Sequence, residues 1–254
     1  MHKIQIWYSP LAKIDQQLYL RYLALLSPCE HKRFRQFKAK SAQNEYLVGR
    51  VLLRTILSKM APIAPQEWQF ISNKYGRPEI TPTQKWAVLG LNFNISHSCG
   101  LVVLAISNDC CIGIDVEAIT RPINAKELAY RCFTSTEANF ICDVNGKKRL
   151  ERFYTIWILK EAYSKALGLG LSLPFDSFSF DLSETQHNII KLTSQHPSSA
   201  LWRFARWKIK SNHQIALAIL PQHSSFKIKF FKSLPLITQK EDLKPKLLTK
   251  WPPD

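Results

Sequence analysis

The sequence lacks the features of a zinc-binding or disulfide-rich domain. Its six cysteines form no Cys-x-x-Cys pair and no histidine cluster lies beside them, so we expect neither a zinc site nor a disulfide framework. Reduced thiols in a cytoplasmic protein are the expected state. Long apolar runs are also missing, because runs such as residues 101–106 and 215–220 are too short to cross a bilayer. Residues 1–4 give no sign of a secretory signal.

Acidic residues are scarce. The chain has 35 Lys and Arg against 19 Asp and Glu, which gives a net charge of +16 at pH 7. Such an excess predicts an anionic partner, which could be nucleic acid, an anionic membrane, a polyanionic small molecule or an acidic protein. The basic residues of the segment 31–54 are Lys32, Arg33, Arg35, Lys38, Lys40, Arg50 and Arg54. They are opposed there by one acid, Glu45.

The remaining composition is that of an ordinary folded domain, with 46% hydrophobic and 21% charged residues. Strands are predicted at residues 4–8, 92–95, 101–106, 112–116, 178–180, 207–209 and 216–219. Helices are predicted from Ser27 and Pro28 onward, and at residues 46–59, 134–141 and 150–167. Strands and helices are mixed without a regular βαβ rhythm, which favours an α+β fold. Residues 46–57 and 153–164 look loosely alike, which suggests an internal duplication.

Two acids lie on one predicted strand, in Gly-Ile-Asp-Val-Glu at residues 113–117. Residues two apart on a strand point to the same side, so Asp115 and Glu117 would present two carboxylates together. Two convergent carboxylates suit Mg²⁺. For this segment alone, a solvated strand face with two acids by chance is the better explanation.

A third acid lies on the predicted helix at residues 150–167. Glu161 and Lys165 are four residues apart and share one side of it. Glu161 could be a metal ligand or a general base, and Lys165 could hold a phosphate. An ordinary Glu–Lys pair on a helix surface is the alternative.

A possible phosphate site follows the predicted strand at residues 92–95. Ser96 and His97 could donate hydrogen bonds to a phosphate, and Arg77 in a Gly-Arg-Pro turn could add a contact. A serine hydrolase is not expected, because the chain has no Gly-x-Ser-x-Gly elbow.

In order and combination, these segments resemble the Sfp-type 4′-phosphopantetheinyl transferases. The motifs are Gly-Arg-Pro at 76–78, Phe-Asn-Ile-Ser-His-Ser at 93–98, Gly-Ile-Asp-Val-Glu at 113–117, Phe-Thr-x-x-Glu at 133–137, and Trp-x-x-Lys-Glu-Ala-x-x-Lys-x-x-Gly-x-Gly-Leu at 157–171. The resemblance runs from about residue 27 to residue 180.

The resemblance implies two similar α+β halves, with the active site in the cleft between them. Residues 1–112 would be the N-terminal half, which carries the basic helix and coenzyme A contacts. Residues 113–225 would be the C-terminal half, which carries the metal-binding strand and the catalytic helix. Residues 226–254 would be a C-terminal extension, whose low apolar density predicts that part of it is mobile.

The resemblance also implies roles for individual residues. Asp115, Glu117 and Glu161 would bind Mg²⁺, and Glu161 and Lys165 would be the catalytic residues. The implied coenzyme A contacts are Arg77, Ser96 and His97 on the 3′-phosphate side, Lys160 and Lys165 near the pyrophosphate, and Arg50 and Arg33. Glu137 matches another acid of the family's cleft. The chain departs from its relatives at Glu45, where several place a basic residue, and at Cys132, where most have an aromatic residue.

The activity implied is transfer of phosphopantetheine from coenzyme A to a serine of an acidic apo acyl or peptidyl carrier protein. The carrier could serve fatty acid, polyketide or nonribosomal peptide synthesis. The resemblance implies a cytoplasmic monomer with no nucleic-acid or membrane partner. Three alternatives stay open: a metal-dependent phosphohydrolase of coenzyme A-like substrates, a basic nucleic-acid-binding protein, and an inactive homologue that only binds coenzyme A.

Overall fold

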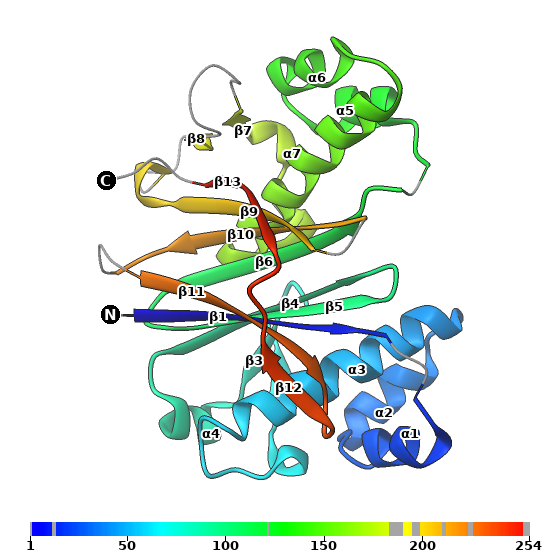
Figure 1. The fold of residues 1–254 in the computed structure, drawn as a ribbon. Coiled ribbons are helices and arrows are strands. Elements are labelled where there is room, and N and C mark those ends of the chain that lie inside the picture. The colour runs from blue at the N-terminus through cyan, green and yellow to red at the C-terminus, as the bar shows by residue number, and fades with distance from the viewer. Residues whose placement is uncertain are drawn as a thin grey trace. The chain divides into compact units, whose positions relative to one another are not determined.

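The computed structural model describes residues 2–11, 14–120, 122–182, 190–194, 199–209, 212–222 and 226–250. The chain divides into two compact units (Figure 1). The first comprises residues 1–109 and 225–243, and the second comprises residues 110–224 and 244–254. Each unit combines helices with a sheet, which confirms the predicted α+β class. No helix in the described part of the chain is long and apolar enough to span a membrane.

The first unit is built on a five-stranded sheet in the order β12-β11-β1-β5-β4. Its elements are β1 (His2–Pro10), α1 (Gln16–Leu23), α2 (Pro28–Arg35), α3 (Lys40–Leu57), β2 (Phe70–Ser72), β3 (Pro78–Ile80), α4 (Pro82–Lys85), β4 (Leu91–Ser98), β5 (Leu101–Asn108), β11 (Phe226–Leu234) and β12 (Thr238–Glu241). Strand β1 runs parallel to β11 and antiparallel to β5, whereas β2 and β3 form a separate pair.

Local sequence signals explain the first unit's elements. Ser27 caps α2 and forms a capping box with Glu30, and Pro28 occupies the first turn, as the sequence predicts. The long helix α3 packs on β4 and β5. It buries Leu47 and Val51 completely, and this apolar side at helical spacing holds it on the sheet.

The second unit is built on a four-stranded antiparallel sheet in the order β13-β9-β10-β6. Its elements are β6 (Cys111–Ala118), α5 (Ala125–Cys132), α6 (Ser135–Cys142), α7 (Gly146–Leu167), β7 (Phe178–Asp181), β8 (Lys191–Ser194), β9 (Arg203–Ile209), β10 (His213–Leu220) and β13 (Lys246–Lys250). Helix α7 packs on β6 and β10. It ends at Gly168, whose φ of 74° is the left-handed conformation that glycine adopts readily.

The two units repeat one combination, a long helix packed on the strands of a sheet. Helix α3 has this place in the first unit and α7 has it in the second. The repeat confirms the prediction of two similar α+β halves.

The predicted C-terminal extension contributes strands to both sheets. Its residues 226–250 form β11 and β12 of the first sheet and β13 of the second. Residues 251–254 lie outside the described residues.

Candidate active site

Strand β6 meets helix α7 at a glycine. A Cβ atom on Gly113 would lie 2.0 Å from the carbonyl oxygen of Ala162 and 2.4 Å from the backbone nitrogen of Ala166. The side of β6 that carries residue 113 therefore faces the helix backbone directly. Residues two apart share a side of a strand, so Asp115 and Glu117 point the same way as Gly113.

Lysine 165 on α7 meets this side of β6. Its Nζ lies 2.5 Å from Oδ1 of Asp115, and the Asp115 side chain is only 5% exposed. Burial lowers the pKa of the Lys165 ammonium, but the negative charges of Asp115, Glu161 and Glu117 outweigh burial and raise it overall. Lys165 is therefore held as a cation among three carboxyl groups.

Glutamate 161 belongs to the same cluster. Burial raises its pKa to about 7, and Lys165 opposes this shift. The charges of Asp115 and Glu117 raise the pKa further. We call Asp115, Glu117, Glu161 and Lys165 the carboxylate cluster. These are the three acids predicted from the sequence to bind metal, and the charges of Asp115 and Glu117 act on Glu161 in this structure.

The carboxylate cluster has the donor chemistry of a magnesium site. Mg²⁺ prefers carboxylate oxygens and binds through few protein ligands, and three acids that repel one another at one place are suited to a divalent cation. Among the described residues, no group of three His, Cys, Asp or Glu side chains is already arranged around a metal position. The cation that contacts Asp115 in this structure is the Lys165 ammonium. The magnesium site stays a prediction.

The close approach at Gly113 gives a first testable prediction. Gly113→Ala is expected to lower the free energy of unfolding by about 2–3 kcal/mol, because the new methyl group would overlap the α7 backbone. Gly49→Ala is the matched control, since its Cβ would meet the end of the Ile95 side chain at 3.2 Å. Chemical denaturation of both variants measures the difference. Equal stability losses would contradict the close packing of β6 on α7.

The structure places Lys160 in the core of the second unit. The side chain is fully buried, and Nζ lies 2.8 Å from Oε2 of Glu137. It also donates to the carbonyl oxygens of Phe175 and Phe178, at 2.6 and 2.5 Å. An ammonium has three donors, and these contacts use all of them. Burial lowers the pKa of Lys160, and Glu137 opposes the shift.

This placement corrects two predictions. Lys160 was predicted to contact the pyrophosphate, but its donors are used inside the protein. Glu137 was matched to an acid of the cleft, yet it is 2% exposed. It accepts hydrogen bonds from Thr134 at the start of α6 and from the backbone nitrogen of Phe180. Both residues therefore hold the interior of the second unit together.

The predicted phosphate residues Ser96 and His97 lie at the end of β4 in the first unit. Adjacent residues on a strand face opposite sides, so Ser96 is buried and the imidazole of His97 is 42% exposed. Nδ1 of His97 lies 2.8 Å from Oε2 of Glu45 on α3. The other carboxylate oxygen of Glu45 accepts from the backbone nitrogen of Gly100 at 2.7 Å. Gly100, with a φ of +80°, belongs to the tight turn between β4 and β5.

Arg77 lies beside a cavity of the first unit. The cavity has a volume of about 380 Å³, and Lys85, Leu89 and Asn92 also line it. The guanidinium of Arg77 donates to the carbonyl oxygen of Phe93 at 3.3 Å. This contact holds Arg77 next to β4, the strand that carries His97.

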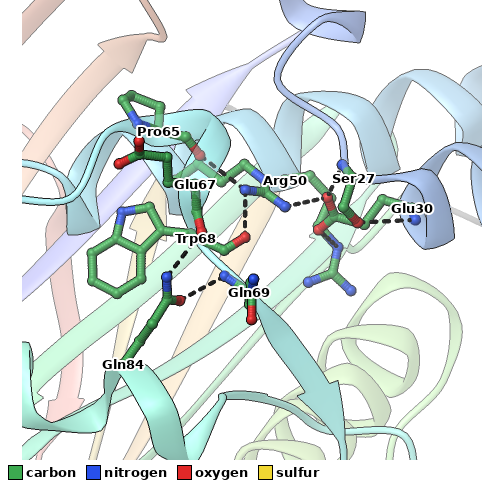
Figure 2. Close-up of polar contacts among 9 residues, drawn as sticks. Ser27, Glu30, Arg50, Pro65, Glu67, Trp68, Gln69 and Gln84 are labelled. Carbon is green, nitrogen blue, oxygen red and sulfur yellow. Dashed lines mark hydrogen bonds and ion pairs between the residues drawn. The ribbon is translucent and has the colours of Figure 1, made fainter.

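Arg50 belongs to a polar network around Glu30, shown in Figure 2. Nε of Arg50 lies 3.6 Å from Oε1 of Glu30, and its guanidinium covers the ring of Tyr46 at 5.2 Å. Arg54 is fully buried and binds the other Glu30 oxygen at 2.5 Å. The network joins α2 to α3.

Arg33, another predicted coenzyme A contact, lies outside this network. It is exposed on α2, and its guanidinium covers the Phe37 ring at 5.4 Å.

Two features escaped the sequence reasoning. The sequence prediction includes Gly113 only as the first residue of a motif, although a glycine before two acids on a buried strand can indicate close packing. Glu45 was noted as a departure from relatives, but its contact with His97 joins residues 52 positions apart. No local pattern indicates such a pair.

Comparisons with known proteins match most of the chain to one family. Residues 13–109 match the family model "4'-phosphopantetheinyl transferase, N-terminal", and residues 111–218 match "4'-phosphopantetheinyl transferase superfamily". The chain is 33% identical over 187 residues to the 4′-phosphopantetheinyl transferase Sfp of Bacillus subtilis, which covers 74% of this chain and 79% of the relative. It is 27% identical to a putative 4′-phosphopantetheinyl transferase of Synechocystis, over 87% of this chain and 94% of the relative.

Two solved structures show weaker likeness. A holo-(acyl-carrier-protein) synthase from Bacillus anthracis in complex with coenzyme A (3′,5′-ADP) matches with a TM-score of 0.33 and 19% identity, over 42% of this chain and 92% of that chain. The synthase from Thermotoga maritima matches with a TM-score of 0.34 and 26% identity, over 44% of this chain and 63% of that chain. Because both scores are low, the assignment depends on the sequence comparisons. These show that the chain belongs to the 4′-phosphopantetheinyl transferase family.

Proposed function

We propose that this chain transfers the 4′-phosphopantetheine group of coenzyme A to a serine of an apo carrier protein. The serine oxygen forms a bond to the β-phosphorus, the bond to the bridging pyrophosphate oxygen breaks, and adenosine 3′,5′-bisphosphate leaves. The observation that carries the proposal is the carboxylate cluster, which lies within the segment matched to the transferase superfamily.

The carboxylate cluster would serve the reacting end of coenzyme A. Asp115, Glu117 and Glu161 would hold Mg²⁺, which when bound neutralises charge on the pyrophosphate oxygens. The Lys165 ammonium would stabilise the negative charge that develops on the leaving group. We assign to Glu161 the uptake of the serine proton, directly or through one water.

Residues of the first unit would hold the nucleotide end. The imidazole of His97 is exposed and anchored, which suits a contact to the 3′-phosphate. We also propose Arg77, Ser96, Arg50 and Arg33 as coenzyme A contacts. Arg77 is supported by its place beside a cavity, and Arg50 by its anchorage to Glu30. Ser96 is the least accessible of this set, at 6% exposure.

The carrier protein would be acidic around its serine. The chain carries a net charge of +16, and Lys32, Arg33 and Arg35 are exposed on α2. A basic surface speeds the encounter with an acidic partner. We further propose a cytoplasmic monomer. The six cysteines are free thiols, which suits a reducing compartment.

The test is a mass measurement. The protein is incubated with coenzyme A, Mg²⁺ and an apo acyl carrier protein, and the carrier is weighed by mass spectrometry. We expect a gain of one phosphopantetheine, complete loss of transfer with EDTA, and recovery when Mg²⁺ is restored. The same reaction without Mg²⁺ or without enzyme is the control. Release of adenosine 3′,5′-bisphosphate from coenzyme A with no gain on the carrier would instead indicate a phosphohydrolase.

A further inference from the structure

We propose that Glu45 is a positioning residue, which orients the His97 imidazole toward the 3′-phosphate of coenzyme A. The inference rests on the proposed function and adds to it a residue that does not itself touch the substrate. The substrate group concerned is a phosphomonoester. The contacts that carry the proposal lie within the first unit, between α3 and the end of β4.

Glu45 is held on both of its carboxylate oxygens. Oε2 lies 2.8 Å from Nδ1 of His97, and Oε1 accepts from the backbone nitrogen of Gly100 at 2.7 Å. The Glu45 side chain is 9% exposed, whereas the His97 side chain is 42% exposed. A buried, fixed carboxylate therefore supports an imidazole that reaches solvent.

This support decides which ring nitrogen can meet a ligand. An ionised carboxylate only accepts hydrogen bonds, so Nδ1 of His97 must be the donor to Glu45. Nε2 is then the nitrogen left for the ligand. A phosphate at Nε2 would place the ring between two anions, and an imidazolium can donate to both of them, one from each nitrogen. Carboxylates fix the tautomer and ring orientation of metal-binding histidines through the same kind of contact.

Burial also limits the repulsion between Glu45 and an incoming phosphate. The carboxylate faces two donors, and the imidazole would stand between it and a phosphate bound at Nε2. The ring would therefore keep the two anions apart. Glu45 can thus assist anion binding although its own charge has the wrong sign for it.

The experiment compares coenzyme A with 3′-dephospho-coenzyme A, which lacks only the phosphomonoester. Steady-state kinetics are measured for the wild type, Glu45→Gln, His97→Gln and the double variant. We expect the wild type to favour coenzyme A by roughly 10- to 100-fold in kcat/KM, the range of a hydrogen bond to a charged group. Glu45→Gln is expected to reduce this preference about 5- to 10-fold, mainly by raising KM for coenzyme A. Its kcat/KM for 3′-dephospho-coenzyme A should stay within about twofold of the wild-type value.

The double variant tests whether Glu45 acts through His97. In the His97→Gln background, Glu45→Gln is expected to cause no further loss of the preference. Glu241→Gln is the matched control, because Glu241 pairs with Lys229 in the same unit. It should keep the wild-type preference.

Three results would overturn the inference. If Glu45→Gln lowers kcat/KM equally for both substrates, Glu45 serves only to stabilise the β4–β5 turn. The exposed His97 ring can be replaced without leaving a cavity, so an unchanged preference in His97→Gln would show that His97 does not bind the 3′-phosphate. A wild-type enzyme that uses both substrates equally would also show that His97 does not recognise this group. If the wild type transfers nothing to the carrier, the proposed function itself fails, which is a separate outcome.

Discussion

Asp115→Asn is expected to lower kcat/KM for coenzyme A about a thousandfold. Asp115 is 3% exposed and contacts the Lys165 ammonium at 2.5 Å. The amide keeps the size of the side chain but removes its charge. The variant would lose a proposed magnesium ligand and the carboxylate that contacts Lys165. Both proposed sources of positive charge at the pyrophosphate would then be disturbed.

The measurement is the rate of carrier modification at several Mg²⁺ concentrations. Higher Mg²⁺ should recover part of the activity, since a weakened site fills at higher concentration. Asp143→Asn is the control, because Asp143 is exposed at the end of α6 and should stay within about twofold of the wild type. A normal rate for Asp115→Asn at limiting Mg²⁺ would remove Asp115 from the metal site.

Lys160→Met is expected to lower the free energy of unfolding by about 3–5 kcal/mol, which is the cost of removing one partner of a buried ion pair. The variant would leave the Glu137 carboxylate buried without its cation. It would also leave the carbonyl oxygens of Phe175 and Phe178 without this donor. At temperatures where the variant stays folded, its KM for coenzyme A should be close to that of the wild type.

Lys147→Met is the matched control on the same helix. The Lys147 side chain is 87% exposed and lies 3.9 Å from Glu151, so its loss should cost less than about 0.5 kcal/mol. Denaturant unfolding and steady-state kinetics are measured on both variants. A stable Lys160→Met protein with a strongly raised KM would return Lys160 to the coenzyme A site and contradict the buried pair.

The two lysines of α7 show where sequence reasoning stops. Lys160 and Lys165 are five residues apart, which places them about 140° apart around a helix. A polar side of the helix would have shown which lysine faces outward. Helix α7 offers no such signal, because its buried residues, among them Phe153, Ile158 and Tyr163, are distributed around its circumference. The spacing of Glu161 and Lys165 was informative, since residues four apart share a side.

The predictions that succeeded depend on local chemistry. Ser27 and Pro28 marked the start of α2, and the helix predicted at residues 150–167 ends where α7 ends, at Leu167. The two-residue period of a strand placed Asp115 and Glu117 on one side of β6. Contacts between distant segments could not be predicted in this way. The pair of Glu45 with His97 and the approach of Gly113 to α7 each depend on how separate elements pack.

The pairing of β1 with β11 has a consequence for how the protein is made. Residues 2–8 align with residues 226–232, so the ribosome must synthesise the chain through residue 232 before this pair can form in full. Until then, β1 has an uncovered edge toward β11, and such edges promote aggregation. The synthesis of β11 and β12, and not the emergence of the N-terminal segment, therefore sets the earliest moment at which the first sheet can be complete.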